Sequence, residues 1–386
     1  MKESPVAGES GCIFPEIRGM ETPLLLMDLR VVGRNVELLR NAFPDVDIWY
    51  ALKSNPDERV VSCLATLGVG FEVASASELR AVLGLGIPSD RIVCLHTIKS
   101  PAFVRLLHDS GISVMAVDCR EEVQKLATIA PRSRVVVRLE TDGHGSRVRL
   151  GGKFGCAPDE VVELARLARR SGLESAGVTM HVGSQCEAIA TWLGALNLCR
   201  AVCERLAEVG APPEIISLGG GLPVPYTTSV PPLAAIGGLV RDAAIQRCGT
   251  AGCRVTFEPG RSIAATAGTL VTSVIGTATR GGERWVYLDA GIYQGLFEWL
   301  PAAGGFAMPI VADHGERPFQ RCRLAGPTCD SLDVLPGEFN LPELRTGDRL
   351  AFRFAGAYST SVSTTFNGFD PPRVVLVGTG GDSRDG

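Results

Sequence analysis

The chain between residues 48 and 260 alternates short apolar runs with longer segments of mixed character. Eight runs can be counted, at residues 48–52, 71, 92–95, 112–117, 135–137, 177–180, 214–218 and 254–257. The segments between them carry apolar residues at helical spacing, as in PDEVVELARLARRSG (residues 158–172), and several close with glycine. Short buried runs that alternate with helices predict parallel strands joined by right-handed crossovers.

Residues able to do chemistry directly follow almost every run. The exception is the fourth run, which ends at Asp118. The others are followed by Lys53, Glu72, His96, Arg138, His181, Gly219–Gly221 and Glu258. Functional groups at the carboxyl ends of alternating strands are typical of enzymes built on a (β/α)8 barrel. We therefore predict such a barrel, of class α/β, over residues 20–262.

The pattern of apolar and polar residues changes after Arg261. Segments such as TLVTSVIG, RWVYLDAG and DRLAFRFAG alternate apolar and polar residues, with glycine, proline and aspartate between them. This pattern predicts antiparallel strands. Residues 263–380 are expected to form an all-β domain, an antiparallel β-barrel or sandwich, which residues 10–28 join. Residues 1–9 and 381–386 are expected to be loose tails.

Composition narrows the classes of function. The chain has 386 residues, of which 45% are hydrophobic, and this is enough to form a packed core. The net charge of −4 gives no electrostatic reason to expect nucleic acid or an anionic membrane surface. No apolar run approaches the roughly 18 residues of a membrane span, and the opening MKESPVAGESG lacks the core of a secretory signal. The 12 cysteines form no CxxC pair and no zinc pattern, so we expect no metal and a reducing cytoplasm.

The basic residues limit any chemistry that needs a neutral amine. The sequence has 5 lysines and 33 arginines, and arginine does not lose its proton at workable pH. Lys2 falls in a tail and Lys125 in the middle of a helical segment. Lys53, Lys99 and Lys153 therefore remain as candidates for Schiff-base chemistry.

Lys53 stands in YALKSNP, at the mouth of the first barrel strand. Desolvation above an apolar floor would lower its pKa and free the amine as a nucleophile. The alternative is a surface lysine that begins a loop.

Two segments after the last barrel strands are candidates for binding an anion. Gly219–Gly221 would let backbone N–H groups approach a phosphate closely, or they form a simple turn between elements. The segment Glu258-Pro-Gly260-Arg261 sets a carboxylate and a guanidinium three residues apart. These two groups either pair with each other or grip a ligand of complementary polarity.

Three further segments carry candidate side chains. His181 can stack on an aromatic ring and Ser184 can reach a phosphate, although a lone histidine is more often structural. Cys329 and Asp330 share a turn in GPTCDSLD, as a proton donor and a cation anchor, unless Cys329 is a buried thiol. Tyr358 is either a core residue or a hydroxyl on a phosphate.

Together these groups match one cofactor, pyridoxal 5′-phosphate (PLP). They comprise a lysine for covalent attachment, a carboxylate to keep a pyridine nitrogen protonated, glycines and an arginine for phosphate, and a histidine for the ring face.

Several motifs, in order, also resemble those of a known family. They are YALKSNP, FEVASASEL, KFG (residues 153–155), HVGSQ, GGGLP, EPGR, GPTCDSLD and GAYSTS followed by FNGF. They resemble those of the fold-type III PLP-dependent decarboxylases, which act on ornithine, lysine, arginine and diaminopimelate, over about residues 20–375. The resemblance implies an alanine-racemase-type barrel with a C-terminal β domain. GPTCDSLD is most similar to the ornithine decarboxylases.

The resemblance implies roles for these residues. Lys53 would hold PLP covalently, Glu258 would pair with the pyridine nitrogen, and His181 would stack on the ring. The phosphate would be bound by Ser184, Gly219, Gly220, Gly221, Gly260, Arg261 and Tyr358, with Glu72 and Arg138 lining the pocket. Cys329 would protonate Cα after CO2 leaves, and Asp330 would bind the distal amine. Both would come from the partner subunit of a homodimer with shared active sites, where Lys153 would be structural.

The chain departs from the family in one segment. Ornithine decarboxylases of the eukaryotic type carry a Tyr-Asp pair whose Asp helps to bind the distal amine, and Pro301-Ala302 stand at that position here. Glu298 could substitute for this Asp, and Trp299 could offer a cation–π face. The identity of the substrate therefore stays open.

The main hypothesis is PLP-dependent decarboxylation of a basic L-amino acid, L-ornithine to putrescine and CO2, in polyamine biosynthesis. The alternatives are a decarboxylase of lysine, diaminopimelate or a modified amino acid in a specialised pathway, and a racemase on the same barrel. A further alternative is an inactive relative that binds protein partners, as antizyme inhibitors do. The intact Lys53, His181, Glu258, Arg261, Cys329 and Asp330 argue against inactivity.

Overall fold

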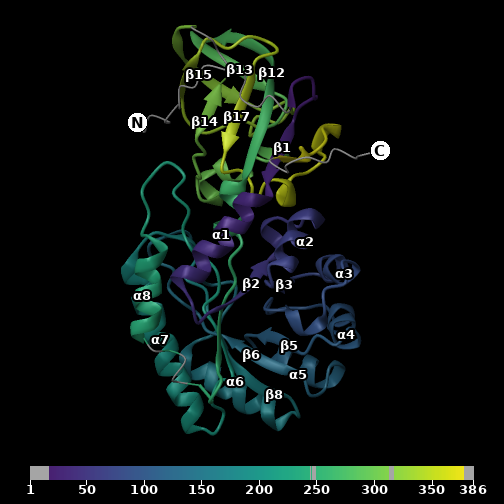
Figure 1. Cartoon of the computed structure of the whole chain (residues 1–386), viewed down its shortest axis with the longest axis vertical. Coiled ribbons are helices and arrows are strands. Elements are labelled where there is room, and N and C mark those ends of the chain that lie inside the picture. Colours follow the sequence, from purple (N-terminus) through teal and green to yellow (C-terminus); the bar gives the residue numbers. More distant parts are fainter. Residues whose placement is uncertain (1–16, 244, 246–248, 313–316, 378–386) are drawn as a thin grey trace. The chain divides into compact units, whose positions relative to one another are not determined.

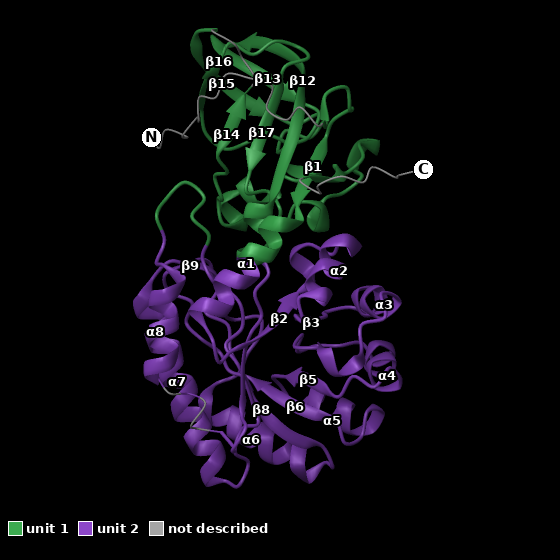
Figure 2. Cartoon of the chain, in the orientation of Figure 1, with its two compact units in different colours: residues 1–34, 224–229, 261–386 green, residues 35–223, 230–260 purple. Residues whose placement is uncertain are grey.

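The computed structural model describes residues 17–243, 245, 249–312 and 317–377. The chain divides into two compact units (Figure 2). One unit, here called the barrel unit, comprises residues 35–223 and 230–260. The other, here called the β unit, comprises residues 1–34, 224–229 and 261–386.

Eight parallel strands form the centre of the barrel unit, in the order β4-β3-β2-β11-β10-β8-β6-β5. They are β2 (Asp47–Ala51), β3 (Gly70–Glu72), β4 (Ile92–Val93), β5 (Val114–Val117), β6 (Arg134–Arg138), β8 (Glu174–Thr179), β10 (Ile215–Ser217) and β11 (Arg254–Phe257). A parallel bridge between Cys94 and Met115 links the two ends of this order. The predicted (β/α)8 barrel is confirmed.

Helices lie around these strands (Figure 1). They are α2 (Glu58–Thr66), α3 (Ala76–Gly84), α4 (Pro101–Asp109), α5 (Arg120–Ile129), α6 (Pro158–Arg170), α7 (Ile189–Glu208) and α8 (Leu233–Ala243), with α1 (Leu29–Ala42) before β2. Helix α4 begins as its sequence predicts, because the Ser100 side chain accepts a hydrogen bond from the Phe103 amide and Pro101 occupies the first turn. None of the helices in the described ranges has the length and apolarity that a membrane crossing requires.

Apolar side chains from several strands fill the barrel interior. One cluster combines Trp49, Val93, Leu95, Val114, Ala116, Val136, Ala176 and Ile215. An antiparallel pair, β7 (Ser146–Val148) with β9 (Ser184–Cys186), adds a small two-stranded sheet that the apolar pattern did not predict. These strands have three residues each and include polar ones, so they lack the apolar run that marks the barrel strands.

The β unit contains one sheet in the order β14-β17-β12-β13-β15-β16, and β1 pairs with both β12 and β18. The strands are β1 (Leu24–Asp28), β12 (Gly268–Arg280), β13 (Glu283–Leu288), β14 (Ile310–Ala312), β15 (Phe319–Ala325), β16 (Phe339–Pro342), β17 (Arg349–Arg353) and β18 (Arg373–Val377). A short helix, α9 (Arg261–Ala264), precedes β12.

The sheet of the β unit is mostly antiparallel, as predicted, but two of its pairs are parallel. Strand β13 runs parallel to β15, and β1 runs parallel to β18. A parallel pair needs a long connection, and both pairs have one, since β14 lies between β13 and β15 in the chain and β1 and β18 come from opposite ends of the sequence. The local alternation of apolar and polar side chains does not indicate whether two strands pair in a parallel or an antiparallel direction.

Gly177 allows β8 to lie very close to β10, because it has no Cβ. Its φ is +154°, and an added Cβ would lie 1.8 Å from the carbonyl oxygen of Ile215. We expect Gly177→Ala to lower the free energy of unfolding by about 1–3 kcal/mol or more, since the strands must move apart. Gly194→Ala is the control, because Gly194 lies in α7 with open space around it, and it should stabilise by about 0.4–1 kcal/mol. Urea denaturation of both variants measures the difference, and equal stabilities would contradict the strand contact.

Candidate functional site

Lys53 lies in a single 3-10 turn, Leu52–Ser54, directly after β2. Its Nζ lies 3.2 Å from Oε2 of Glu72, the last residue of β3. The lysine side chain is 48% exposed and the carboxylate 2%. Lys53 is therefore less enclosed than the predicted apolar floor implies, and the partner that its amine meets is an enclosed negative charge.

The other candidate lysines have different environments. Lys99 is fully buried, and its Nζ donates to the carbonyl oxygens of His96, Thr97 and Ala116 and lies 3.1 Å from Glu122. Lys153 lies over the ring of Phe154, with 5.0 Å between Nζ and the ring centroid. Lys99 is therefore locked inside the unit, whereas Lys53 presents its amine at the end of a barrel strand.

Glu258 follows β11, and hydroxyl groups from two neighbouring strands hold it. Ser217 and Thr179 donate hydrogen bonds to its Oε1 at 2.5 and 3.2 Å. Enclosure raises the pKa of Glu258, and the nearby charge of Glu72 adds to that effect. Thr179 and Ser217 were missed from the sequence, although both are the last residues of barrel strands, a position that could have identified them.

His181 follows β8 on the same rim of the barrel. Its Nδ1 accepts a hydrogen bond from the amide of Gly183 at 3.0 Å, and its carbonyl oxygen accepts one from Thr141. Enclosure lowers the pKa of His181 to about 3, with further contributions from the charges of Arg138 and Lys53. The imidazole is therefore neutral at physiological pH, which suits a ring that stacks on another ring.

Gly219–Gly221 form the loop after β10, and the packing there admits no side chain. Added Cβ atoms on Gly219 and Gly221, both at positive φ, would lie 2.1 Å from the Met180 oxygen and 2.3 Å from the Gly183 oxygen. A Cβ on Gly220 would lie 3.0 Å from Nε2 of His181. The backbone of this loop therefore lies directly against the His181 segment, as a glycine cradle requires.

Arg138, at the end of β6, packs on the ring of Phe154, with 5.5 Å from the guanidinium carbon to the ring centroid. His96 meets the same ring edge-on at a centroid distance of 5.5 Å. Enclosure and the charge of Lys99 lower the pKa of His96. Phe154 of the KFG motif thus positions Arg138 through an aromatic contact that the sequence did not reveal. Ser184 lies at the start of β9.

In the β unit, Arg261 is buried and surrounded by partners. Its Nη1 and Nη2 donate to the two carboxylate oxygens of Glu298, both at 2.5 Å, and Nη1 also donates to the Tyr226 hydroxyl at 2.8 Å. The rings of Phe306 and Tyr358 have centroids 4.1 and 4.9 Å from the guanidinium carbon. In the EPGR segment, the carboxylate of Glu298 pairs with Arg261, and hydroxyl groups hold Glu258.

Glu298 and Trp299, the expected substrate contacts, are both engaged by partners within the β unit. Trp299 is 5% exposed, and its ring packs against Phe339 and Phe352 at centroid distances of 5.6 and 6.2 Å. The ring is therefore packed in the core of the β unit, which argues against a cation–π surface for a substrate. Glu298 is 6% exposed and pairs with Arg261, so its carboxylate already has a cation.

The GPTCDSLD loop leaves the carboxylate of Asp330 half-buried and encloses that of Asp333. Cys329 is exposed, and its amide donates to Oδ1 of Asn367 at 3.0 Å. Asp330 accepts hydrogen bonds from the Leu332 amide and the Tyr293 hydroxyl, and these bonds lower the pKa of Asp330. The carboxylate is therefore charged at physiological pH and stands ready for a cation.

Asp333, 1% exposed, anchors the GPTCDSLD loop from inside. It accepts hydrogen bonds from the Ile292 amide and from the amide and hydroxyl of Thr328, at distances of 2.7 to 3.1 Å. Asp333 and Tyr293 are structural partners of Asp330 to which sequence reasoning assigned no such role. The alternating pattern gives no signal for Asp333, because an aspartate between leucine and valine is expected to point toward solvent.

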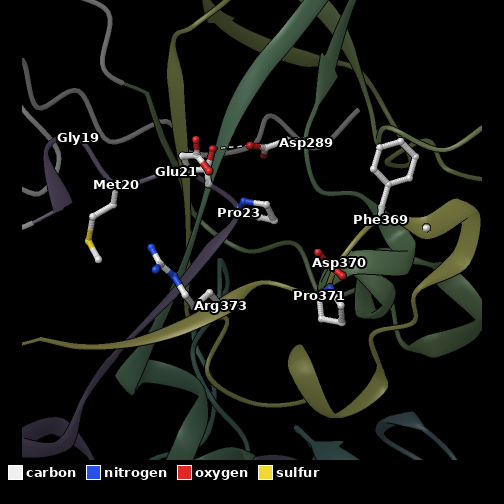
Figure 3. Close-up of a pocket in the computed structure, with 11 residues that line it drawn as sticks. Gly19, Met20, Glu21, Pro23, Asp289, Phe369, Asp370, Pro371 and Arg373 are labelled. Carbon is white, nitrogen blue, oxygen red and sulfur yellow. Dashed lines mark hydrogen bonds between the residues drawn. The ribbon is translucent and has the colours of Figure 1, made fainter. Parts of the chain in front are cut away.

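A surface pocket of about 700 Å³ in the β unit is lined by none of the predicted site residues. Its walls carry Glu21, Asp289, Asp370 and Arg373 (Figure 3). Asp289 accepts hydrogen bonds from Thr22 and from the Ser273 amide, so its charge is already engaged within the unit. Within the described residues, no group of three or more histidine, cysteine or acidic side chains is arranged to hold a metal ion.

The low pKa of His181 predicts a pH dependence of stability in the protein without ligand. The folded-state pKa, about 3, lies below the usual value of about 6.5, so the contribution is complete above pH 6.5. It is lost as the pH falls from 6.5 toward 3, by at most about 1.4 kcal/mol per pH unit. We expect His181→Phe to show a smaller loss over that window than the wild type in denaturation series. Parallel pH profiles would show that the ring is not enclosed.

Comparison with known proteins agrees with this geometry. Residues 29–265 match the family model "Pyridoxal-dependent decarboxylase, pyridoxal binding domain". The chain is 33% identical to the lysine/ornithine decarboxylase of Selenomonas ruminantium, over 90% of this chain and 88% of that protein. It is also 33% identical to the ornithine decarboxylase of Schizosaccharomyces pombe, over 91% and 82% of the two chains.

Two solved structures share the fold. The lysine/ornithine decarboxylase of Vibrio vulnificus, complexed with cadaverine, has a TM-score of 0.86 and 32% identity over 94% of this chain and 96% of that one. The arginine decarboxylase of Paramecium bursaria Chlorella virus, bound to agmatine, has a TM-score of 0.86 and 26% identity, over 94% and 98%. On the family match and the full-length similarity, the chain belongs to the pyridoxal-dependent decarboxylases and is a PLP-dependent amino-acid decarboxylase.

Proposed function

We propose that this enzyme converts L-ornithine to putrescine and CO2. The observation that carries the proposal is the carboxylate of Asp330, which is charged, held by Tyr293 and set in a loop whose tip is exposed. A single carboxylate of this kind suits the distal amine of a short diamino acid. Relatives named ornithine decarboxylase and lysine/ornithine decarboxylase support the same substrate class.

The residues of the barrel rim fit PLP. The glycine loop packs so closely against the His181 segment that any Cβ would clash there, and the neutral imidazole can cover a ring face. Glu258, kept in place by two hydroxyl groups, can face a pyridine nitrogen. When bound, PLP supplies an electron sink for the pair of electrons left on Cα after decarboxylation.

We assign the barrel side chains as follows. Lys53 would hold the cofactor, next to Glu72, whose carboxylate contacts the lysine amine. Arg138 and Glu72 line the pocket, with Arg138 positioned by Phe154. Ser184 and Gly219–Gly221 bind the phosphate, as do Gly260, Arg261 and Tyr358.

We further infer that the enzyme acts as a homodimer with shared sites. Cys329 and Asp330 would then serve the Lys53 of a second copy, with Cys329 delivering a proton to Cα and Asp330 binding the distal amine. Two exposed apolar side chains support a contact surface there. Leu332 lies in the same loop and is 68% exposed, and Phe366, whose ring packs on Tyr293, is 43% exposed.

All ten cysteines in the described residues carry free thiols, in keeping with a reducing compartment such as the cytoplasm.

A second candidate is a longer or modified basic amino acid. Pro301-Ala302 stand where a second anionic anchor is expected in some relatives, and Glu298 is engaged by Arg261. Solved relatives complexed with cadaverine and with agmatine show that similar folds accept products of different length.

A substrate panel decides between these candidates. Purified PLP-loaded protein should release CO2 from L-ornithine with putrescine as the product, and kcat/KM for L-ornithine should exceed that for L-lysine by about tenfold. D-ornithine, arginine and diaminopimelate complete the panel, with CO2 measured and the amine identified. A preference for lysine would replace the main proposal, and no release from any member while PLP is bound would indicate a modified substrate.

Subunit mixing tests the shared site. Lys53→Ala should lose the visible absorption band of bound PLP, and Cys329→Ala should keep the band while losing amine yield. Neither variant alone should form putrescine at the wild-type rate. Equal mixing should restore about one quarter of wild-type activity, since half of the dimers are hybrids with one intact site of two. Activity that stays at the level of the separate variants would place Lys53 and Cys329 in the same chain's site.

A further inference from the structure

Arg261 is a buried cation of the β unit, and its guanidinium donates hydrogen bonds to both Glu298 and Tyr226. Its two terminal nitrogens bind the two oxygens of Glu298 in parallel, at 2.5 Å each. Parallel bidentate geometry fixes the plane of a guanidinium as well as its position, which a single contact does not do. Glu298 therefore determines how Arg261 is oriented.

The environment of the pair makes this orientation rigid. The side chains of Arg261 and Glu298 are 6% and 8% exposed, so water cannot replace either partner at low cost. The hydroxyl of Tyr226, a residue that is 3% exposed, accepts a third hydrogen bond from Nη1 of Arg261 at 2.8 Å. Phe306 and Tyr358 contact the guanidinium through their rings.

The local sequence explains how Glu298 reaches this position. It lies in the 3-10 turn Phe297–Trp299, whose neighbour Trp299 is packed into the core of the β unit against Phe339 and Phe352. The Phe306 amide donates to the carbonyl oxygen of Glu298 at 2.8 Å. The backbone on both sides is thus held, and the carboxylate is directed at Arg261.

We propose that Glu298 is a positioning residue for the cofactor phosphate, acting through Arg261 with the help of Tyr226, and that it is not a substrate ligand. The proposal rests on the assignment of Arg261 as a phosphate ligand made above. A guanidinium held in one orientation loses little further freedom when it binds a phosphate group, and such preorganisation strengthens binding. The segment before Pro301-Ala302 therefore serves the cofactor, and the distal amine depends on Asp330.

The test compares PLP with pyridoxal, which lacks the phosphate, on the Glu298→Gln variant. Glutamine keeps the shape of the side chain but offers one acceptor and an opposing NH2 group to Arg261. We expect the dissociation constant of PLP, measured from the visible band, to rise by about tenfold or more. The dissociation constant of pyridoxal should change less than about twofold, and KM for the amino acid at saturating PLP should stay near the wild-type value.

Control variants separate this effect from damage to the fold. Glu204→Gln removes an exposed carboxylate from an Arg200 pair on α7 and should leave all three constants unchanged. Glu298→Asp retains the carboxylate and should recover part of the PLP affinity. If Glu298→Gln does not fold, Tyr226→Phe removes one of the bonds to Arg261 while it keeps the ion pair, and should raise the PLP dissociation constant by a smaller factor.

The possible outcomes are distinct. A raised KM with unchanged PLP binding would make Glu298 a substrate ligand and overturn the proposal. Tighter PLP binding by Glu298→Gln would show that Glu298 competes with phosphate for Arg261, and equal losses for PLP and pyridoxal would show a merely structural role. Failure of the wild type to bind PLP or to release CO2 would instead overturn the proposed function itself.

Discussion

The shared direction of the eight barrel strands is the constraint on which the site depends. When all strands run parallel, their carboxyl ends meet at one rim, whatever their separation in sequence. Lys53 and Glu72 come together in this way, and so do Thr179, Ser217 and Glu258. The hydrogen-bonded register of the strands thus decides which functional groups become neighbours.

Gathering charged groups at one rim has electrostatic consequences. Enclosure raises the pKa of Glu258, and the nearby charge of Glu72 adds to this effect. Hydroxyl groups of Ser217 and Thr179 offset part of the effect by donating hydrogen bonds to the carboxylate. His181, enclosed near Arg138 and Lys53, has the opposite shift and remains neutral. One small region therefore holds an enclosed carboxylate beside Lys53, a second carboxylate supported by hydroxyl groups, and an uncharged ring.

In the β unit, buried charged side chains are likewise balanced by an opposite charge or by hydrogen-bond donors. Arg261 is balanced by Glu298, and Asp333 is satisfied by three donors from the residues around it. Because Asp333 anchors the GPTCDSLD loop from within, its neighbour Asp330 can be held near the surface by Tyr293. Two aspartates three residues apart thus have different surroundings, since Asp333 is enclosed by its donors and Asp330 is half-buried at the surface.

The sequence by itself determined the barrel, the all-β texture that follows it, the cofactor and the list of reactive residues. These could be predicted because period, strand length and residue chemistry are local properties, and because only five lysines compete for one role. Tertiary structure alone decided which partners these residues meet. It assigned Glu298 to Arg261, buried Trp299 against Phe339 and Phe352, added Thr179, Ser217, Tyr226 and Tyr293, and made two strand pairs parallel. Such contacts join residues far apart in the chain, and pairing at that range depends on packing and burial, which no local pattern encodes.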